Sequence, residues 1–105
     1  MNDVVASTKI VGIRPNGERM EIVFAVGRPY LESGGELEQW RCPVSLEPLQ
    51  SRLADAAGAD SLHSICVALY LGLYLLGQFK EQGGKLLHDD DTEFPLASYS
   101  FGISG

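Results

Sequence analysis

Positive charge is scarce in this sequence. Lysine and arginine together number 8 against 14 aspartates and glutamates, which gives a net charge of −6 at pH 7. Most of the excess lies in the second half, because residues 1–53 hold six basic and seven acidic residues, whereas residues 54–105 hold two and seven. A protein that binds nucleic acid neutralises phosphates with a basic surface, and none is visible here. We therefore expect no nucleic-acid partner.

Cysteine is also sparse. The chain has two, Cys42 and Cys66, which is too few for a disulfide scaffold. Each lies in an apolar pattern, so we expect two small buried side chains rather than a bridge. The N-terminal residues Met1–Val5 lack the basic segment and long apolar run of a secretory signal. These features favour a cytoplasmic protein.

Long hydrophobic runs are missing too. The longest charge-free apolar stretch, Ile65 to Leu76, is about half of the ~20 residues that span a bilayer. We therefore expect a helix buried in a globular protein and no membrane partner. Hydrophobic residues make up 45% and charged residues 21%, which is a globular composition, and 105 residues suit one domain spanning 1–105.

Two β-prone runs open the chain, Thr8–Arg14 and Arg19–Val26. Asn16-Gly17 lies between them and predicts a hairpin turn, because both residue types tolerate positive φ. Apolar residues alternate along the second run and place one face of the hairpin in the core: Met20, Ile22, Phe24 and Val26.

A third strand is expected from Gln39 to Leu46, where apolar and polar residues alternate. Pro43 should then lie at an edge or a bulge, because proline cannot donate to the ladder. For the same reason the segment 27–30, which contains Pro29, should end the second strand. The intervening segment 31–38 reads as an exposed hairpin connection rather than a functional lid.

Two helices are expected next. A short helix begins at Pro48 and runs to about Ala57, and a long helix begins at Asp60 or Ser61 and runs to about Gln82. Gly83-Gly84 ends the long helix. The residues after it predict a short strand at 85–88 and, from the alternation of Tyr99, Phe101 and Ile103, a last strand or docked tail.

The fold class is therefore α+β. We expect an antiparallel sheet of three or more strands, with the N-terminal β-hairpin first. It packs against one long apolar helix plus a short helix, and a C-terminal strand or tail completes the domain.

The long helix is apolar on more than one side. At ~100° per residue one stripe forms the expected core face: Leu62, Ile65, Cys66, Leu69, Leu73 and Leu76. A second apolar face holds the candidate interface residues: Val67, Leu71, Tyr74 and Leu75. Large exposed apolar patches are uncommon on monomers, so the short helix, the C-terminal tail, a second copy or a partner protein should cover this face.

The polar clusters do not predict a catalytic, cofactor or metal site. The acidic run 89–93 lacks the spacing of a calcium loop and reads as a solvated turn, although a bound cation stays an alternative. His63 and Cys66 lie one helical turn apart and could form a nucleophile and base or two zinc ligands, but a thiol in an apolar stripe stays protonated. Gly83-Gly84-Lys85 lacks the rest of a phosphate loop and follows a helix.

Arg14 and Arg19 flank the hairpin turn and are candidates for contact with an anionic group. The alternative is that they form ion pairs with Glu18 and Glu21 at solvated strand ends.

The order of these elements resembles that of small bacterial proteins of an uncharacterised family. The residues concerned are Trp40-Arg41-Cys42-Pro43, the apolar helix and Gly83-Gly84-Lys85-Leu86-Leu87. The resemblance covers nearly the whole chain. It implies a stand-alone bacterial domain, and it implies no activity, cofactor or catalytic residue.

Three functions remain open from the sequence. The leading hypothesis is a non-enzymatic protein-interaction module, either a homodimer or bound to another protein, because the helix has a second apolar face. An immunity-type or inhibitor protein that binds a basic partner would use the acidity of residues 54–105. A small anionic-ligand binder or enzyme would use the arginines or the His63–Cys66 pair.

Overall fold

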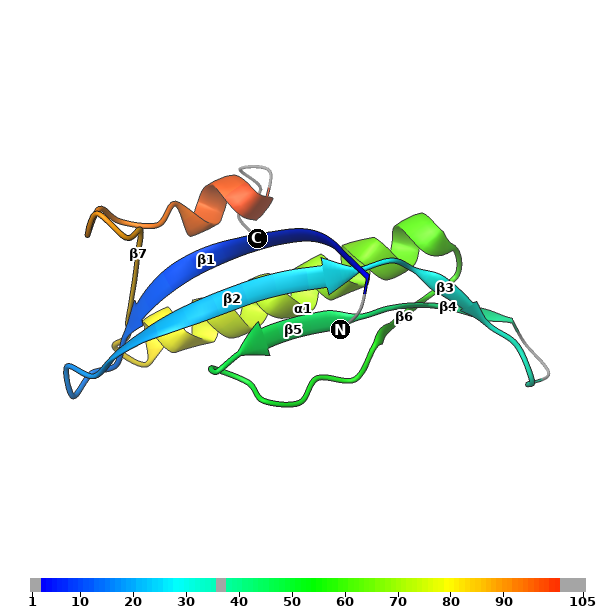
Figure 1. Ribbon diagram of the computed structural model, residues 1–105, viewed down its shortest axis with the longest axis horizontal. Coiled ribbons are helices and arrows are strands. Elements are labelled where there is room, and N and C mark those ends of the chain that lie inside the picture. Colours follow the sequence, from blue (N-terminus) through cyan, green and yellow to red (C-terminus); the bar gives the residue numbers. More distant parts are fainter. Residues whose placement is uncertain (1–2, 36–37, 101–105) are drawn as a thin grey trace.

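The computed structural model describes residues 3–35 and 38–100 and has the expected α+β architecture (Figure 1). Four strands form one antiparallel sheet in the order β5-β2-β1-β7: β1 (Val4–Ile13), β2 (Arg19–Gly27), β5 (Val44–Glu47) and β7 (Lys85–Leu87). Three strands form a second sheet in the order β3-β4-β6: β3 (Tyr30–Glu32), β4 (Gln39–Cys42) and β6 (Ala56–Gly58). The helix α1 (Ser61–Glu81) packs along both sheets, and a 3₁₀ helix, η1 (Leu96–Ser100), follows β7.

The predicted N-terminal hairpin is confirmed. β1 and β2 pair from Val4 opposite Gly27 to Ile13 opposite Arg19. In the turn, the Gly17 N–H donates to the Arg14 carbonyl at 2.8 Å, and Gly17 has a φ of +91°. Asn16 contributes differently from expectation, since its Oδ1 accepts the Glu18 N–H at 2.9 Å and its φ is not positive. The turn therefore needs a left-handed residue only at Gly17.

Pro29 and Pro43 lie where the two chain segments of one long hairpin pass from one sheet into the other. Pro29 lies in the gap between β2 and β3, and Pro43 lies in the gap between β4 and β5. The Gly27 N–H donates to the Pro43 carbonyl at 2.9 Å, so the two gaps lie opposite each other. Proline cannot donate to a ladder, so regular pairing stops here and each chain passes from one sheet into the other. The predicted third strand is thus two strands, with Pro43 at the break.

The predicted short helix from Pro48 to Ala57 is wrong. β5 continues to Glu47, the Glu47–Pro48 peptide is cis, and the Gln50 N–H donates to the Leu46 carbonyl at 2.9 Å in a turn. Residues 56–58 then form β6, which pairs with β4. The free edge of β4 offers this segment backbone partners that a short isolated helix lacks, and this tertiary pairing overrides local propensity. Among the described residues the helical segment other than α1 is η1. It begins 39 residues after Ala57 and so does not correspond to the predicted short helix.

The predicted limits of the long helix are confirmed. Asp60 is the N-cap, and its Oδ1 accepts the His63 N–H at 2.7 Å. At the other end the Gly83 N–H donates to the Lys80 carbonyl at 3.0 Å, and Gly83 has a φ of +96°. A residue with positive φ after the last turn stops a helix, as the glycine pair predicts.

The core lies between α1 and the two sheets. The hairpin face predicted to be buried does lie there, with Ile22, Phe24 and Val26 buried and Met20 partly buried. The other members of the core come from β1, β4, β5, β6, α1, β7 and the segment after β7: Ile10, Cys42, Val44, Leu46, Ala56, Ala68, Leu76, Phe79, Leu86 and Phe94. The four-stranded sheet thus supplies most of the core, and α1 covers it.

Candidate functional site

The face of α1 that packs on the sheets is rotated from the predicted core stripe. Leu62 is 69% exposed and Cys66 is exposed, so their expected burial is wrong. The buried helix residues are mostly small at the N-terminal end and large at the other: Ser64, Ala68, Gly72, Leu76 and Phe79. Small residues allow the backbone of α1 to approach the sheets closely, and an apolar periodicity that runs all round a helix does not reveal which side will do so.

Close approach is visible at two glycines. A Cβ atom at Gly58 of β6 would overlap the backbone of His63 and Ser64 in the first turn of α1. A Cβ atom at Gly72 would overlap the ring of Phe24 on β2. Ser64 is fully buried there, and its Oγ satisfies its hydrogen-bonding need by donating to the Ser61 carbonyl at 2.8 Å. Ala68 and Gly72 therefore serve contacts inside the chain.

Three of the four candidate interface residues are covered by the chain itself. Val67, Leu71 and Leu75 are half-buried and pack against the core, whereas Tyr74 is 49% exposed. The apolar surface of α1 that the chain leaves exposed is therefore the neighbouring face.

That neighbouring surface, which we call the outer face of α1, consists of Leu62, His63, Cys66, Tyr70, Tyr74 and Gly77. Leu62, Cys66, Tyr70 and Tyr74 recur every fourth residue, which places them along one side of the helix. Tyr70 is 68% exposed, and its ring stacks on that of Tyr74 with centroids 6.0 Å apart. A Cβ atom at Gly77 would meet no atom within 4 Å, so this position is open.

Carboxylate, lysine and arginine side chains are missing from the whole length of this face. Asp60 and Lys80 bracket a stretch, residues 61–79, that contains no aspartate, glutamate, lysine or arginine. Such a helix also meets the length and composition of a membrane-crossing segment, with a mean hydropathy of 1.5. One side of α1 lies in the core. A helix of a globular protein that is apolar both on its packed side and on its outer face has this same composition.

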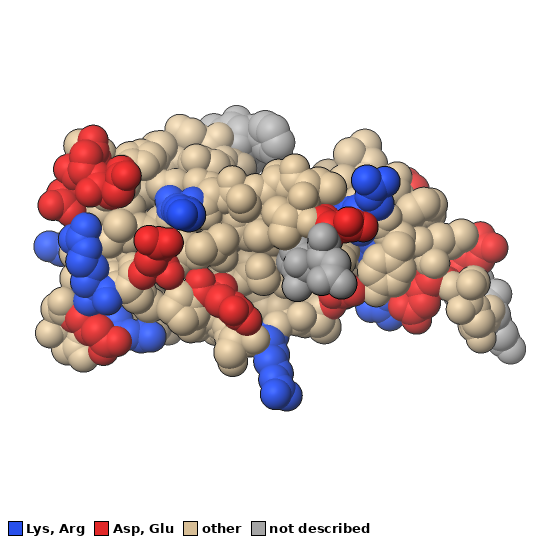
Figure 2. All heavy atoms as spheres, viewed as in Figure 1, with Lys and Arg blue, Asp and Glu red and all other residues tan. Residues whose placement is uncertain are grey.

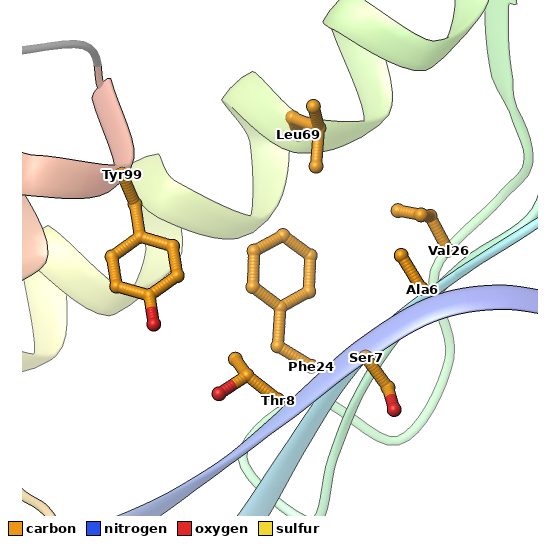
Figure 3. Close-up of a pocket in the computed structure, with 7 residues that line it drawn as sticks. All are labelled: Ala6, Ser7, Thr8, Phe24, Val26, Leu69 and Tyr99. Carbon is orange, nitrogen blue, oxygen red and sulfur yellow. The ribbon is translucent and has the colours of Figure 1, made fainter.

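An apolar cleft lies between β1 and α1 (Figure 3). Its volume is about 180 Å³, and Phe24, Leu69 and Tyr99 enclose it. β1 contributes the small residues Ala6 and Thr8 here, so its own side chains do not fill the space. The cleft contains no ionisable group except the Tyr99 phenol and offers no set of catalytic groups.

The edge of β1 beside the cleft is open. β7 pairs only with Val11–Ile13, so residues 4–10 of β1 have no second strand neighbour within 3–35 and 38–100. Our sequence interpretation missed the cleft because it began the first strand at Thr8. The small residues Ala6-Ser7-Thr8 were the available signal. The predicted alternation with Phe101 and Ile103 falls on residues outside the described range, while Tyr99 itself lies in η1 and stacks on Phe94 with centroids 4.8 Å apart.

Charged side chains of both signs gather at the end of the molecule that carries the β1–β2 turn (Figure 2). Arg14 Nε lies 3.9 Å from Glu18, and Arg19 Nη1 lies 3.1 Å from Asp91. Both candidate anion contacts thus already face a carboxylate. Lys9, rather than an arginine, pairs with Glu21 at 3.9 Å.

The acidic run 89–93 lies in a turn, residues 88–93, that is held by its own contacts. Asp90 Oδ1 accepts both the side-chain hydroxyl and the backbone N–H of Thr92, and these hydrogen bonds lower the pKa of Asp90. Glu93 pairs with Lys80 at 3.5 Å. Within residues 3–35 and 38–100 there is no group of three or more His, Cys, Asp and Glu side chains that could hold a metal ion.

The two cysteines differ in environment. Cys42 is fully buried, as predicted, and burial raises the pKa of its thiol. Cys66 lies on the outer face of α1 instead of in the core. His63, its neighbour one turn away, uses Nδ1 to accept the Ala59 N–H at 2.9 Å, so that nitrogen is already engaged. This arrangement lends no support to a nucleophile–base pair.

A polar cluster in the second sheet was not anticipated. Arg41 Nε donates to Glu32 at 2.8 Å, and the Tyr30 hydroxyl donates to Asp55 Oδ2 at 2.6 Å. The hydrogen bond to Asp55 is the main cause of the raised pKa of Tyr30. These contacts tie the β3–β4 hairpin to the segment before β6.

Comparison with protein-family models, with curated proteins and with solved structures gives no match for this chain. Function therefore has to be argued from the geometry of the site itself.

Proposed function

We propose that this protein is a protein-interaction module, not an enzyme, and that it binds through the outer face of α1. The observation that supports this proposal is a helix face that combines high exposure with the absence of carboxylate, lysine and arginine side chains: Leu62 and Tyr70 are each more than two-thirds exposed. Burial of an exposed leucine or aromatic side chain contributes about 1.5–3 kcal/mol. Tyrosine is also enriched among the residues that dominate binding energy at interfaces.

A non-enzymatic role is supported by the state of the polar residues. Arg14 and Arg19 face carboxylates, and His63 Nδ1 is occupied by a backbone N–H. The cleft beside β1 is apolar and lacks converging polar groups of the kind a catalytic site needs. No specific contact favours the immunity-type or anion-binding hypotheses over this one.

We also propose the cytoplasm as the compartment. The two cysteines are both free thiols, one of them on the surface. An exposed free thiol persists more readily where the compartment is reducing. A bacterial origin rests on the resemblance of the sequence alone.

The test is the size of the complex that carries the chain in extracts of its native cells. The wild-type protein should elute from a sizing column well above its own 11.4 kDa, and Tyr70→Glu should elute as the monomer. Val5→Glu is the matched control, since Val5 is an apolar residue 54% exposed on β1 rather than on α1. Thermal unfolding of each purified variant verifies that the fold is intact.

Two results would contradict the proposal. One is a wild-type chain that elutes as a free monomer at its native concentration. The other is a large complex that survives Tyr70→Glu unchanged, because the binding surface would then lie elsewhere.

A further inference from the structure

We propose that a polar pocket at the C-terminal end of α1 binds a small carboxylate that carries an apolar group. The pocket lies where the β1–β2 turn, the turn after β5 and the last turns of α1 meet (Figure 1). Its volume is about 230 Å³, and the surface that lines it is mostly polar. The pocket shares no lining residue with the outer face of α1, so ligand binding here would be a second function, separate from the proposed protein interaction.

Four polar side chains from these three segments line the pocket: Arg14, Gln50, Gln78 and Gln82. Within residues 3–35 and 38–100, no hydrogen bond engages the guanidinium of Arg14 or the side-chain amides of Gln50 and Gln82. Gln78 donates one N–H to the Tyr74 hydroxyl at 2.9 Å and keeps a second N–H and its side-chain oxygen. Hydrogen-bonding groups that the fold does not use therefore meet around one small space.

Arg14 gives the pocket its charge. Among the described residues that line the pocket, it is the one with an ionisable side chain. Glu18 lies 3.9 Å from Arg14 Nε, which is beyond hydrogen-bonding distance, so the fork of guanidinium N–H groups stays available to a ligand. Such a fork binds a carboxylate through two parallel hydrogen bonds. Because there is one cation, a ligand with a single negative charge fits better than a doubly charged phosphate.

The glutamines complete the set of donors that a carboxylate needs. An ionised carboxylate has about four acceptor sites. The fork of Arg14 fills two of them, and the amide N–H groups of Gln50 and Gln82 are donors for the others. The C-terminal end of a helix disfavours an anion, but here two carbonyl groups of the last turn accept the N–H groups of Gly83 and Gly84.

An apolar wall and the small volume define the rest of the ligand. Leu49, Leu75 and Phe79 line the pocket and belong to the core or pack against it. An alkyl group on the ligand would displace water from this wall. The pocket holds about eight water molecules at about 30 Å³ each, so the ligand has about eight non-hydrogen atoms. Isocaproate, a carboxylate on a short branched alkyl chain, has this size and chemistry.

The first measurement is a titration of the purified full chain with isocaproate, followed through the NMR signals of the glutamine side-chain amides. The signals of Gln50, Gln78 and Gln82 should shift saturably, with a millimolar dissociation constant because the ligand is so small. Acetate lacks the alkyl chain and isocaproamide lacks the charge. Each should therefore bind about tenfold more weakly than isocaproate.

The second measurement repeats the titration with variants of the pocket. Arg14→Met removes the guanidinium fork and should weaken isocaproate binding about tenfold. Arg28→Met is the matched control and should have no effect, since it removes the same charge from an exposed arginine between β2 and β3. Gln82→Glu keeps the size of an exposed side chain but adds a carboxylate that repels the ligand, so it should abolish binding. Thermal unfolding verifies that each variant is folded.

A third titration identifies the source of the carboxylate, which is either a free acid or the C-terminus of a peptide. Acetyl-alanyl-leucine presents a branched alkyl chain beside a C-terminal carboxylate. Tighter binding of this peptide than of isocaproate would assign the site to a protein C-terminus, and weaker binding would assign it to a free acid. Both results support a carboxylate site.

Three results would overturn the carboxylate site. They are the lack of any saturable shift at tens of millimolar isocaproate, equal binding of isocaproamide, and equal weakening by Arg14→Met and Arg28→Met. Tyr70→Glu should leave isocaproate binding unchanged, because Tyr70 does not line the pocket. Failure of the carboxylate site is thus distinguishable from failure of the proposed interaction, which depends on a Tyr70-dependent complex in native extracts.

Discussion

The ring of Phe24 on β2 fills the space beside Gly72 of α1 that a side chain at position 72 would occupy. This contact sets how closely the helix approaches the four-stranded sheet. It also sets which side of α1 is left outside, because the outer face lies opposite to Gly72 on the helix. The packing of one glycine is thus linked directly to the surface that we assign to binding.

Gly72→Ala should destabilise the protein. The added methyl group has to displace the Phe24 ring in a packed core, and overpacking of this kind costs about 1–3 kcal/mol. Gly77→Ala is the matched control on the same helix, since its methyl group enters open space and alanine favours a helix by about 1 kcal/mol over glycine. Urea unfolding of both variants measures the difference, and equal stabilities would contradict the close contact at Gly72.

The two thiols should react at very different rates. Cys66 is exposed and should react at once with a thiol reagent such as dithionitrobenzoate. Cys42 is fully buried, and burial raises its pKa, so it should react only when the chain unfolds. Cys66→Ser should therefore remove the fast phase and Cys42→Ser the slow one. A single fast phase of two thiols in the native protein would show that the core around Cys42 is open.

Asp60→Ala should weaken the start of α1. Asp60 accepts the His63 N–H, and loss of an N-cap side chain typically costs about 1 kcal/mol. Asp60→Asn keeps an acceptor oxygen and should restore most of the loss. Hydrogen exchange at the His63 amide reports the effect locally, and an exchange rate unchanged by the alanine variant would argue against the cap.

Asp90 should stabilise the turn 88–93 only in its ionised form. Hydrogen bonds from the Thr92 hydroxyl and N–H lower its pKa in the folded protein, so its contribution is present above the pKa of the unfolded chain and disappears as the pH falls through the folded value. Acidification should therefore lower the melting temperature more for the wild type than for Asp90→Asn. Titration of the Asp90 carboxyl by NMR should give a value below that of an exposed aspartate, and a normal value would contradict the hydrogen bonds.

The sequence predicted those features of the fold that depend on local chemistry. Asn16-Gly17 located the hairpin turn, Asp60 and Gly83 located the ends of α1, and Pro43 located a break in the sheet. Each of these residues acts through its own backbone or a neighbour a few positions away. The prediction of a short helix at 48–57 was wrong because the end of that segment pairs with β4. β4 lies too far back along the chain for local interactions to reveal this pairing.

Tertiary structure alone decided which side of α1 faces the core. The helix is apolar on nearly all sides, so its periodicity left several orientations equally suitable. The sheets selected the side with Ser64, Ala68 and Gly72, because only small residues admit the Phe24 ring and the backbone of β6. That choice buried Val67, Leu71 and Leu75 partly within the chain and turned Leu62, Cys66 and Tyr70 outward. The sequence by itself determined that α1 has more apolar surface than one core needs, and close packing at two glycines determined where that surplus lies.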